Sequence, residues 1–172
     1  MTLAVIGFGS NLGNGPHLVQ SAWTRFSLEP KIAPLQLSAL YVTEAVGMVS
    51  SSLFTNAVGL IDTDLDPSEL LHLLLQVERE YGRVRDTDEE GYQDRFLDLD
   101  LLYFGEIVCQ LPDLILPHPH IASRLFVLAP LAQLLPDFND PVSGQTAEQM
   151  YQLLLSRIEK GDLPAQHISR LA

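Results

Sequence analysis

The chain has 172 residues, 47% of them hydrophobic and 19% charged, which is typical of a globular protein with a sizeable core. A formal net charge of −12 argues against a general binder of the nucleic-acid backbone. The single cysteine, Cys109, excludes an internal disulfide and favours a reducing compartment. Leu-rich runs are too short to span a bilayer, and no basic segment precedes the first apolar run. We therefore expect a cytoplasmic protein without a membrane anchor.

The predicted elements begin with a strand over 3–8, an apolar run that ends at glycines. The loop "GSNLGNG" follows, and Pro16 begins a helix with one apolar face. Alternating apolar residues predict a second strand over 35–41, and residues 53–61 predict a third.

The next helix has the clearest ends in the chain. Asp66 is the expected N-cap, Pro67 occupies the first turn, Glu69 completes a capping-box pattern, and Gly82 ends the helix. The polar, acidic run "DTDEEGYQD" over 86–94 then predicts a loop.

A strand over 97–104 comes next, and "FGEIVCQ" predicts a short extra strand after it. The proline-punctuated "LPDLILPHPH" cannot form a regular helix, so we expect the following helix only around 130–135. Thr146 and Gln149 cap a last helix over about 146–160. The order strand–helix–strand–strand–helix–strand predicts an α+β, ferredoxin-like sandwich with an antiparallel sheet and additional C-terminal helices. We expect one domain over 1–172.

The run "DRFLDLDLLYF" at 94–104 carries two carboxylates on one face of an apolar strand. Alternation puts the leucines at 97, 99 and 101 with Tyr103 on one face, and Asp98 and Asp100 with Leu102 and Phe104 on the other. Two aspartates about 7 Å apart on one face are placed either to share hard cations or simply to face solvent. Since Mg²⁺ prefers few protein carboxylates together with phosphate oxygens, the first interpretation implies a polyphosphate ligand.

The few arginines of this acidic chain gather near that strand. "GRVRD" places Arg83 and Arg85 on one side of an extended segment, and Arg95 just precedes the strand. They either pair with the acidic residues of 86–90 or neutralise phosphate oxygens beside a bridging metal ion.

Three further features are open to more than one interpretation. "GFGSNLGN" lacks the complete phosphate-binding glycine patterns, so a tight strand-to-helix turn is the better interpretation. Asn56, in an apolar strand, is either a core amide or a group that reads the edge of a heterocycle beside Phe54. His118 in "PHPH" has no Cys or His partner at zinc spacing.

Together these pieces resemble the 6-hydroxymethyl-7,8-dihydropterin pyrophosphokinase family of folate biosynthesis. Four stretches carry the resemblance over roughly residues 3–135: "GFGSNLGN", "FTNAV", "GRVRD…DRFLDLDLLYFG" and "LPHPHIASRLFVLAPL". The resemblance implies transfer of pyrophosphate from ATP to 6-hydroxymethyl-7,8-dihydropterin, with release of AMP.

The resemblance also implies roles for individual residues. Asp98 and Asp100 would bind two Mg²⁺ ions, and Arg83 and Arg95 would act during transfer. ATP would contact residues at the family's nucleotide positions: Glu78, Arg85, Tyr92, Leu101, His118, Pro119 and Arg124. The pterin would contact a second set and stack between its two phenylalanines: Gly9, Thr43, Val46, Phe54, Asn56 and Phe126. The loops at 44–52 and 86–94 would close over the site.

The acidic loop at 86–94 and Glu44 depart from the family pattern, which bears on the affinity for ATP and pterin. Two other functions stay open at the level of residues. One is a divalent-metal phosphohydrolase that uses the same carboxylates, and the other is a non-enzymatic, ferredoxin-like nucleotide-binding module. We expect a monomer that acts on small molecules.

Overall fold

The computed structural model describes residues 1–44, 52–82 and 94–171. Their helices and strands follow in this order: β1 (Thr2–Ser10), α1 (Gly15–Phe26), β2 (Ile32–Leu37), β3 (Tyr41–Thr43), β4 (Phe54–Thr63), α2 (Pro67–Glu80), β5 (Asp98–Phe104), β6 (Cys109–Leu111), β7 (Leu114–Leu116), the 3₁₀ turn η1 (Ile121–Ser123), α3 (Leu125–Leu134), α4 (Ala147–Glu159) and β8 (Ile168–Arg170).

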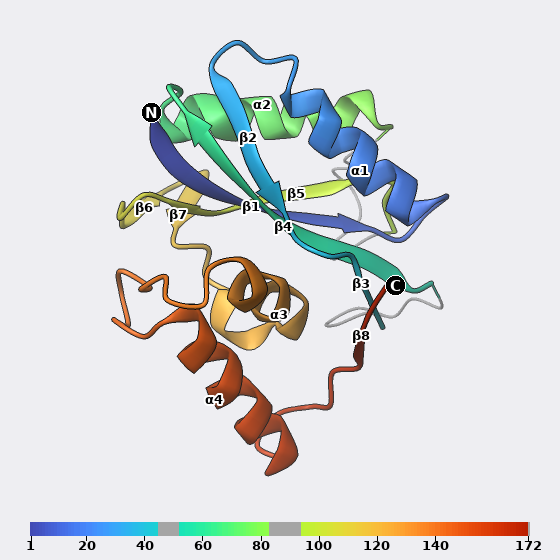
Figure 1. The fold of residues 1–172 in the computed structure, drawn as a ribbon, viewed down its shortest axis with the longest axis vertical. Helices are drawn as coiled ribbons and strands as arrows, with labels where there is room; N and C mark the ends of the chain where they lie inside the picture. Colours follow the sequence, from blue (N-terminus) through green and yellow to red (C-terminus); the bar gives the residue numbers. More distant parts are fainter. Residues whose placement is uncertain (45–51, 83–93, 172) are drawn as a thin grey trace.

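The main sheet has the order β5-β1-β4-β3-β8, and β2 also pairs with β4 (Figure 1). Each of these pairings is antiparallel. Strands β6 and β7 form a separate two-stranded hairpin. Because β1 lies between β5 and β4, the two strand–helix–strand units interleave. The predicted ferredoxin-like α+β sandwich with an antiparallel sheet is confirmed.

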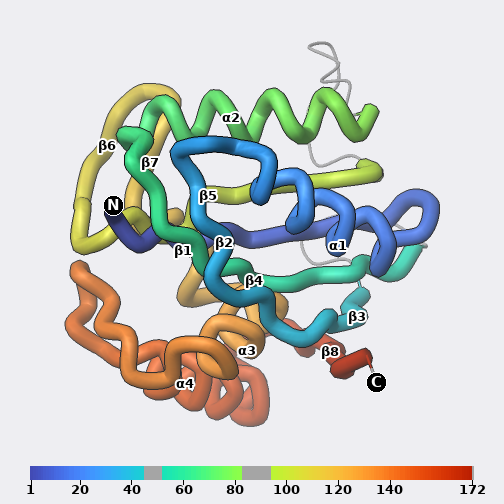
Figure 2. The backbone as a smooth tube through the Cα atoms, turned by 45° about the horizontal axis from the view of Figure 1, so that its top comes forward, coloured from blue at the N-terminus to red at the C-terminus, as the bar shows by residue number. Residues whose placement is uncertain are grey.

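Helices α1 and α2 cover one face of the sheet, and α3 and α4 lie on the other face (Figure 2). We call the buried cluster under α1 and α2 the first core; it contains Phe26, Leu74 and Ile6. The second core, under α3 and α4, contains Leu128 and Val58. The C-terminal helices α3 and α4 thus pack on the sheet face that α1 and α2 leave open.

The helix ends follow the predicted capping chemistry. Asp66 accepts a hydrogen bond from the Glu69 amide at 2.8 Å, and Glu69 accepts one from the Asp66 amide at 2.9 Å. Thr146 and Gln149 form the same reciprocal pair at the start of α4. These bonds satisfy amides that the first helical turn leaves without intrahelical partners, so the local sequence fixes both helix starts.

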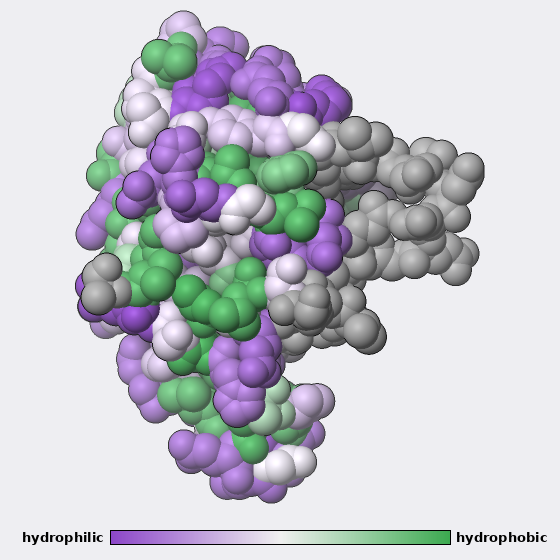
Figure 3. All heavy atoms as spheres, turned by 90° about the vertical axis from the view of Figure 1, so that its right-hand side faces the viewer, coloured by the Kyte–Doolittle hydropathy of each residue, from purple (hydrophilic) through white to green (hydrophobic). Residues whose placement is uncertain are grey.

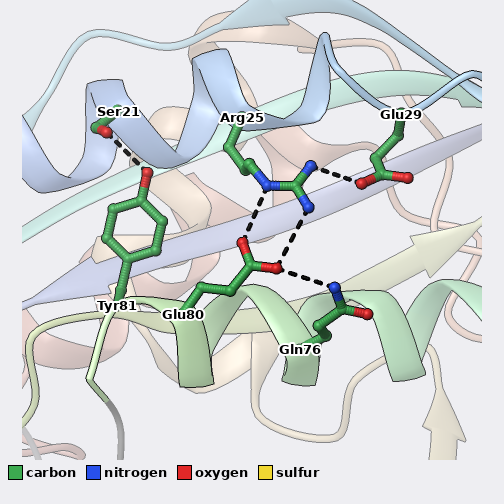
Figure 4. A network of polar contacts seen from close by, with 6 residues as sticks. All are labelled: Ser21, Arg25, Glu29, Gln76, Glu80 and Tyr81. Atoms are coloured by element: carbon green, nitrogen blue, oxygen red, sulfur yellow. Dashed lines mark hydrogen bonds and ion pairs between the residues drawn. The ribbon is translucent and has the colours of Figure 1, made fainter.

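Polar contacts also link the two helices on the first face (Figure 4). Arg25 of α1 donates to both carboxylate oxygens of Glu80 of α2, at 3.0 and 3.3 Å, and to Glu29 at 2.5 Å. The hydroxyls of Ser21 and Tyr81 lie 2.7 Å apart. Hydrogen bonds to Glu80 and then Glu29 raise the pKa of Arg25, although burial opposes them. Since these groups are near the surface, the ion pairs of Arg25 contribute little to the free energy of unfolding, and their main effect is to orient α1 against α2.

The predicted strand over 35–41 is wrong as a single element. The structure has β2 up to Leu37 and β3 from Tyr41, with a break between them. At the break, the Ser38 hydroxyl accepts a hydrogen bond from the Val58 amide at 3.0 Å, and the Ser38 amide donates to the Val58 carbonyl at 2.9 Å. Leu35, one of the alternating apolar residues on which the strand prediction rested, is 54% exposed.

The predicted alternation of β5 holds over its first half and is wrong at its end. The partners of β1 along β5 step from Leu101 to Tyr103, which leaves Leu102 as an extra residue in a bulge. Tyr103 therefore packs in the second core, and Phe104 packs in the first.

Three other elements differ from the sequence predictions. The helix expected around 130–135 begins earlier, at Leu125, and Pro130 lies inside it. The predicted extra strand is β6, and its partner β7 lies in the proline-punctuated segment. Strand β8 was not predicted. It is three residues long and is defined by its pairing with β3.

The surface carries mixed polarity on the face shown in Figure 3, where hydrophobic and hydrophilic patches alternate among the described residues. None of the helices in residues 1–44, 52–82 and 94–171 is long and apolar enough to cross a membrane.

Tyr103 provides a test of the second core. Its buried hydroxyl donates to Asp140 at 2.9 Å. Burial tends to raise the pKa of Asp140, but hydrogen bonds from Ser143, Tyr103 and Val142 outweigh it and leave that pKa lowered. We expect Tyr103→Phe to lower the free energy of unfolding at pH 7 by about 1–3 kcal/mol.

This loss should depend on pH. Because the folded-state pKa of Asp140 lies below its unfolded value, the stabilisation is present above that unfolded value and is lost as the pH falls through the folded one. Urea unfolding at pH 7 and pH 3 measures the free energy of unfolding of Tyr103→Phe and of wild type. The difference between the two free energies should be smaller at pH 3 than at pH 7. The half-buried Tyr151→Phe on α4 is the matched control. An equal gap at both pH values would contradict the prediction.

Candidate active site

Two cavities meet at the start of β5. The aromatic pocket encloses about 610 Å³, its open mouth included, and has these lining residues: Gly7, Phe8, Gly9, Thr43, Glu44, Phe54, Asn56, Ala57, Arg95, Asp98, Asp100, Arg124, Phe126 and Val127. The hairpin cavity encloses about 950 Å³ on the same measure, between α2 and the β6–β7 hairpin, and includes Leu71, Leu75, Glu78, Leu101, Pro112, Ile115, His118 and Pro119. Both cavities are lined by Arg95, Asp98, Asp100 and Arg124.

Asp98 and Asp100 point away from the first core, as the strand pattern predicted. Leu99 and Leu101 between and beyond them are buried in that core. On the neighbouring strand β1, Gly9 pairs with Asp98 and Gly7 with Asp100. The absence of a side chain at Gly9 leaves the space beside Asp98 open.

Gly9 lies between the Asn56 amide and Asp98 at the bottom of the aromatic pocket. A Cβ at Gly9 would lie 3.4 Å from the Asn56 Oδ1 and 3.7 Å from the Asp98 Cβ. A side chain at this position would therefore fill the space between the amide and the first carboxylate.

Arg95 and Arg124 partly offset the negative charges of Asp98, Asp100 and Glu78. Arg95 Nη1 lies 2.9 Å from Asp98 Oδ1. Burial, then repulsion from Asp98 and Glu78, raises the pKa of Asp100 to about 6, although Arg124 and Arg95 oppose the shift. A carboxylate whose pKa is raised in this way gains when a cation arrives.

His118 faces Asp100 from the segment after β7. Its Nε2 lies 4.0 Å from Asp100 Oδ1. Burial, then the charge of Arg124 and the neighbouring His120, lowers the pKa of His118 to about 4, against a small opposing effect of Asp98. At neutral pH the imidazole is therefore uncharged and offers an N–H donor rather than a cation.

The aromatic pocket combines two phenylalanines with one buried amide. Phe54 begins β4 and Phe126 lies in the first turn of α3, so one ring lines the pocket from the sheet and the other from the helix. Asn56 is 3% exposed, and its Nδ2 donates to Thr43 Oγ1 at 2.9 Å. Asn56 thus has a side-chain partner. Its Oδ1 lies beside Gly9, where the absence of a side chain leaves the floor of the aromatic pocket open.

Glu78 holds the strand that carries the carboxylates. It is 1% exposed in the last turn of α2, and its Oε1 accepts a hydrogen bond from the Leu99 amide at 2.8 Å. Leu99 lies between Asp98 and Asp100 on an edge strand of the sheet. Glu78 therefore lines the hairpin cavity and at the same time fixes the backbone of β5.

Four residues implied by the resemblance lie outside the described residues: Arg83, Arg85, Tyr92 and Val46. Most of the two loops expected to close over the site, 44–52 and 86–94, also lies outside them. The structure brings the other expected site residues to one or both cavities.

Comparison with known proteins identifies the family. Residues 5–136 match the 7,8-dihydro-6-hydroxymethylpterin-pyrophosphokinase (HPPK) family. The chain belongs to this family. The resemblance to it, the enzyme class of an ATP-dependent pyrophosphokinase and the assignment to folate biosynthesis are confirmed.

Individual relatives agree with this HPPK assignment. The 2-amino-4-hydroxy-6-hydroxymethyldihydropteridine pyrophosphokinase of Pseudomonas aeruginosa is 40% identical over 155 residues, which are 90% of this chain and 94% of the relative. The Bacillus subtilis protein of the same name is 34% identical over 147 residues, 86% of each chain.

Solved structures are similar in fold. An HPPK-DHPS in complex with substrates matches with a TM-score of 0.73 at 14% identity, over 99% of this chain and 46% of that one. Plasmodium falciparum HPPK-DHPS with pteroate matches with a TM-score of 0.73, over 94% of this chain and 44% of that one. This chain therefore spans just under half of those two solved chains.

Asn11 is a site residue that the sequence reasoning missed. Its Oδ1 accepts a hydrogen bond from the Arg95 amide at 2.7 Å, and its Nδ2 donates to Asp94 at 2.5 Å. The Asn11 amide also donates to the Arg95 carbonyl at 3.1 Å. The available signal was a polar residue directly after β1 in "GFGSNLGN", a run interpreted only as a turn. This clamp fixes the backbone from which Arg95 reaches Asp98.

We expect Asn11→Ala to lower the kcat of the HPPK reaction by about tenfold or more, because each 1.4 kcal/mol of lost alignment is a factor of ten in rate. The matched control is Asn14→Ala, which removes the N-cap contact of Asn14 with the His17 amide at the start of α1. That control should cost about 1 kcal/mol of stability without changing kcat. Steady-state kinetics at a temperature where both variants are folded would test this, and an unchanged kcat for Asn11→Ala would refute the clamp.

Proposed function

We propose that this chain binds ATP in the hairpin cavity and 6-hydroxymethyl-7,8-dihydropterin in the aromatic pocket, and transfers the β,γ-pyrophosphoryl group between them. The observation that carries the proposal is the meeting of the two cavities at Asp98, Asp100, Arg95 and Arg124. Two substrates held in adjoining cavities react as one assembled unit, which removes much of the entropic barrier.

The pterin fits the chemistry of the aromatic pocket. A flat heterocycle can stack between Phe54 and Phe126, and such sandwiching buries area on both ring faces. The Asn56 amide and the backbone near Thr43 are placed to read its hydrogen-bonding edge. In this orientation the hydroxymethyl group points toward Asp98 and Asp100 across the open floor at Gly9.

ATP fits the hairpin cavity. Leu101 and Pro119 offer apolar contact for the base, while Arg124 and the neutral His118 offer donors to the phosphate oxygens. Glu78 keeps its hydrogen bond to the Leu99 amide of β5 and lines the wall of the hairpin cavity. By the family resemblance, Arg83, Arg85 and Tyr92 join them.

Mg²⁺ suits the two aspartates. Within the part of the chain that the structure describes, no three or more His, Cys, Asp or Glu side chains gather as a metal site, so Asp98 and Asp100 would share the ions with phosphate oxygens and water. Burial and the neighbouring charges of Asp98 and Glu78 raise the pKa of Asp100, so a cation bound there would favour its charged form. When bound, two Mg²⁺ ions would neutralise the triphosphate and acidify the attacking hydroxyl.

The transfer is a displacement at the β-phosphorus of ATP. The pterin hydroxymethyl oxygen forms a bond to that phosphorus and loses its proton, and the bond from the phosphorus to the oxygen of the α-phosphate breaks, so AMP leaves. Arg95 and Arg124 lie where the equatorial phosphate oxygens would pass and would neutralise their charge. The protein supplies alignment and charge, and no separate general base is required.

The two alternative functions are less favoured. A phosphohydrolase using the same carboxylates needs a positioned water and a base, and it has no use for an aromatic pocket at the same carboxylates. A non-enzymatic nucleotide-binding module does not need that pocket either. We also propose that the protein is a monomer, that it acts in the cytoplasm and that residues 1–172 form one domain.

The decisive assay incubates the protein with Mg²⁺, ATP and the reduced hydroxymethylpterin and resolves the nucleotides. AMP formed only when pterin is present is the expected result. Pterin-independent ADP or AMP would indicate a phosphohydrolase, and unchanged ATP would indicate a binding module.

Asp98→Ala and Asp100→Ala should each abolish turnover while the chain stays folded. The unfolding midpoint of Asp100→Ala should stay at or above that of wild type, because the change relieves the repulsion in the pair. Asp98→Ala should lower the midpoint, because it also breaks the ion pair with Arg95. Glu106→Ala, just past the end of β5, is the control for removal of an exposed acid. Near-normal kcat in either aspartate variant at saturating Mg²⁺ would show that the metal assignment is wrong.

Phe126→Ala should raise the KM for pterin by about tenfold, since a stacked aromatic contributes about 0.5–1.5 kcal/mol beyond its buried area. The KM for ATP should rise less than that for pterin; some rise is expected because the Arg124 guanidinium carbon lies 5.5 Å from the centre of the Phe126 ring. Phe126→Leu keeps apolar bulk without an aromatic face and should give an intermediate KM. Equal changes in the KM values for pterin and ATP would contradict the assignment of Phe126 to pterin binding.

A further inference from the structure

The segment that follows α4 returns to the aromatic pocket. Residues 160–171 lie beyond the HPPK match at 5–136. Within this segment β8 pairs with β3, and the Leu171 amide donates to the Leu40 carbonyl at 2.8 Å. Figure 1 shows the segment running from α4 to the strand that ends at Thr43. The C-terminal segment thus reaches one wall of the pocket through β3.

Gln166 of the same segment holds the other wall. Its Oε1 accepts a hydrogen bond from the Leu125 amide at 2.9 Å, and its Nε2 donates to the Ser123 carbonyl at 2.9 Å. These two backbone groups flank Arg124, and Phe126 follows one residue later. Gln166 therefore grips the backbone that carries an arginine and an aromatic ring of the site.

The hydrogen bond from the Leu125 amide to Gln166 replaces a capping hydrogen bond that the residues at the start of α3 do not provide. The N-cap residue of α3 is Arg124, and its side chain makes no capping hydrogen bond. The first amides of a helix have no intrahelical partner and need one from elsewhere. Gln166, 41 residues away, accepts from the first of them. The start of α3 thus depends on the C-terminal segment for its cap.

The segment is anchored at both sides of Gln166. Leu163 and Ile168 are half-buried and pack against the second core. At the other end of α3, Gln133 accepts hydrogen bonds from the Tyr41 hydroxyl at 3.2 Å and the Ala39 amide at 3.3 Å, so α3 is also tied directly to the start of β3. The α3 wall and the β3 wall are therefore joined at two points.

We propose that residues 160–171 form a strap that sets the separation between the α3 and β3 walls of the aromatic pocket, and that Gln166 is a positioning residue for pterin binding. The proposal rests on the proposed function, because it concerns the same pocket. A wall held in its bound position lowers the ordering cost that the ligand must overcome.

The test compares Gln166→Ala with Gln152→Ala. Gln152 lies on the exposed side of α4 and donates to Glu148, so this control removes the same side chain away from the strap. Gln166→Ala should raise the KM for pterin by about fivefold, the size expected when a few side chains and a loop must be ordered on binding. The KM for ATP should rise less than that for pterin, because Arg124 is only one of several residues that line the hairpin cavity. Gln152→Ala should match wild type.

A second variant separates positioning from plain stability. Gln166→Glu keeps an acceptor for the Leu125 amide but loses the donor to Ser123, so its KM for pterin should lie between those of wild type and Gln166→Ala. Urea unfolding is measured alongside. If Gln166→Ala lowers the unfolding midpoint and leaves both KM values at wild-type levels, the strap is only structural and the inference fails. If wild type itself forms no pterin-dependent AMP, the proposed function fails instead.

Discussion

Two like charges on one face of an edge strand repel each other, and the arrangement of the site follows from how this chain accommodates them. Asp98 and Asp100 extend from β5 while Leu99 and Leu101 fix the same strand in the first core. Burial and mutual repulsion raise the pKa of Asp100 to about 6. Such a pair is costly in the free protein and becomes favourable when cations bind between the carboxylates.

Three neighbouring elements keep this pair in place without neutralising it fully. Strand β1 places glycine opposite each aspartate, α2 holds the Leu99 amide through Glu78, and the residue before the strand, Arg95, pairs with Asp98. Each support comes from a different part of the ferredoxin-like framework. The aromatic pocket opens beside the start of α3, and the hairpin cavity opens at the β5 edge of the sheet, between α2 and the β6–β7 hairpin.

Much of this could be predicted from the sequence, because the signals are local. The capping box at Asp66 and Glu69 and the alternation through Leu101 each depend on residues a few positions apart. The motifs also led to the correct family. The bulge at Leu102 was not predictable, since it arises from the pairing of β5 with a strand that lies far away in the sequence.

Single side chains that act over a long sequence distance were missed for the same reason. Asn11 clamps Arg95 from 84 positions away, and Gln166 caps α3 from 41 positions away. Neither stands out by residue type or spacing, because asparagine and glutamine are ordinary in loops. Strand β8 is too short to have a pattern of its own and exists through its pairing with β3.

The most direct test of the central claim is a crystal structure of the protein with Mn²⁺ in place of Mg²⁺, a non-hydrolysable ATP analogue and the pterin. Anomalous scattering would locate the metal. The account predicts metal at about 2.0–2.2 Å from carboxylate oxygens of both Asp98 and Asp100, between the nucleotide in the hairpin cavity and the pterin in the aromatic pocket. Metal bound away from these aspartates, or both ligands in one cavity, would contradict it.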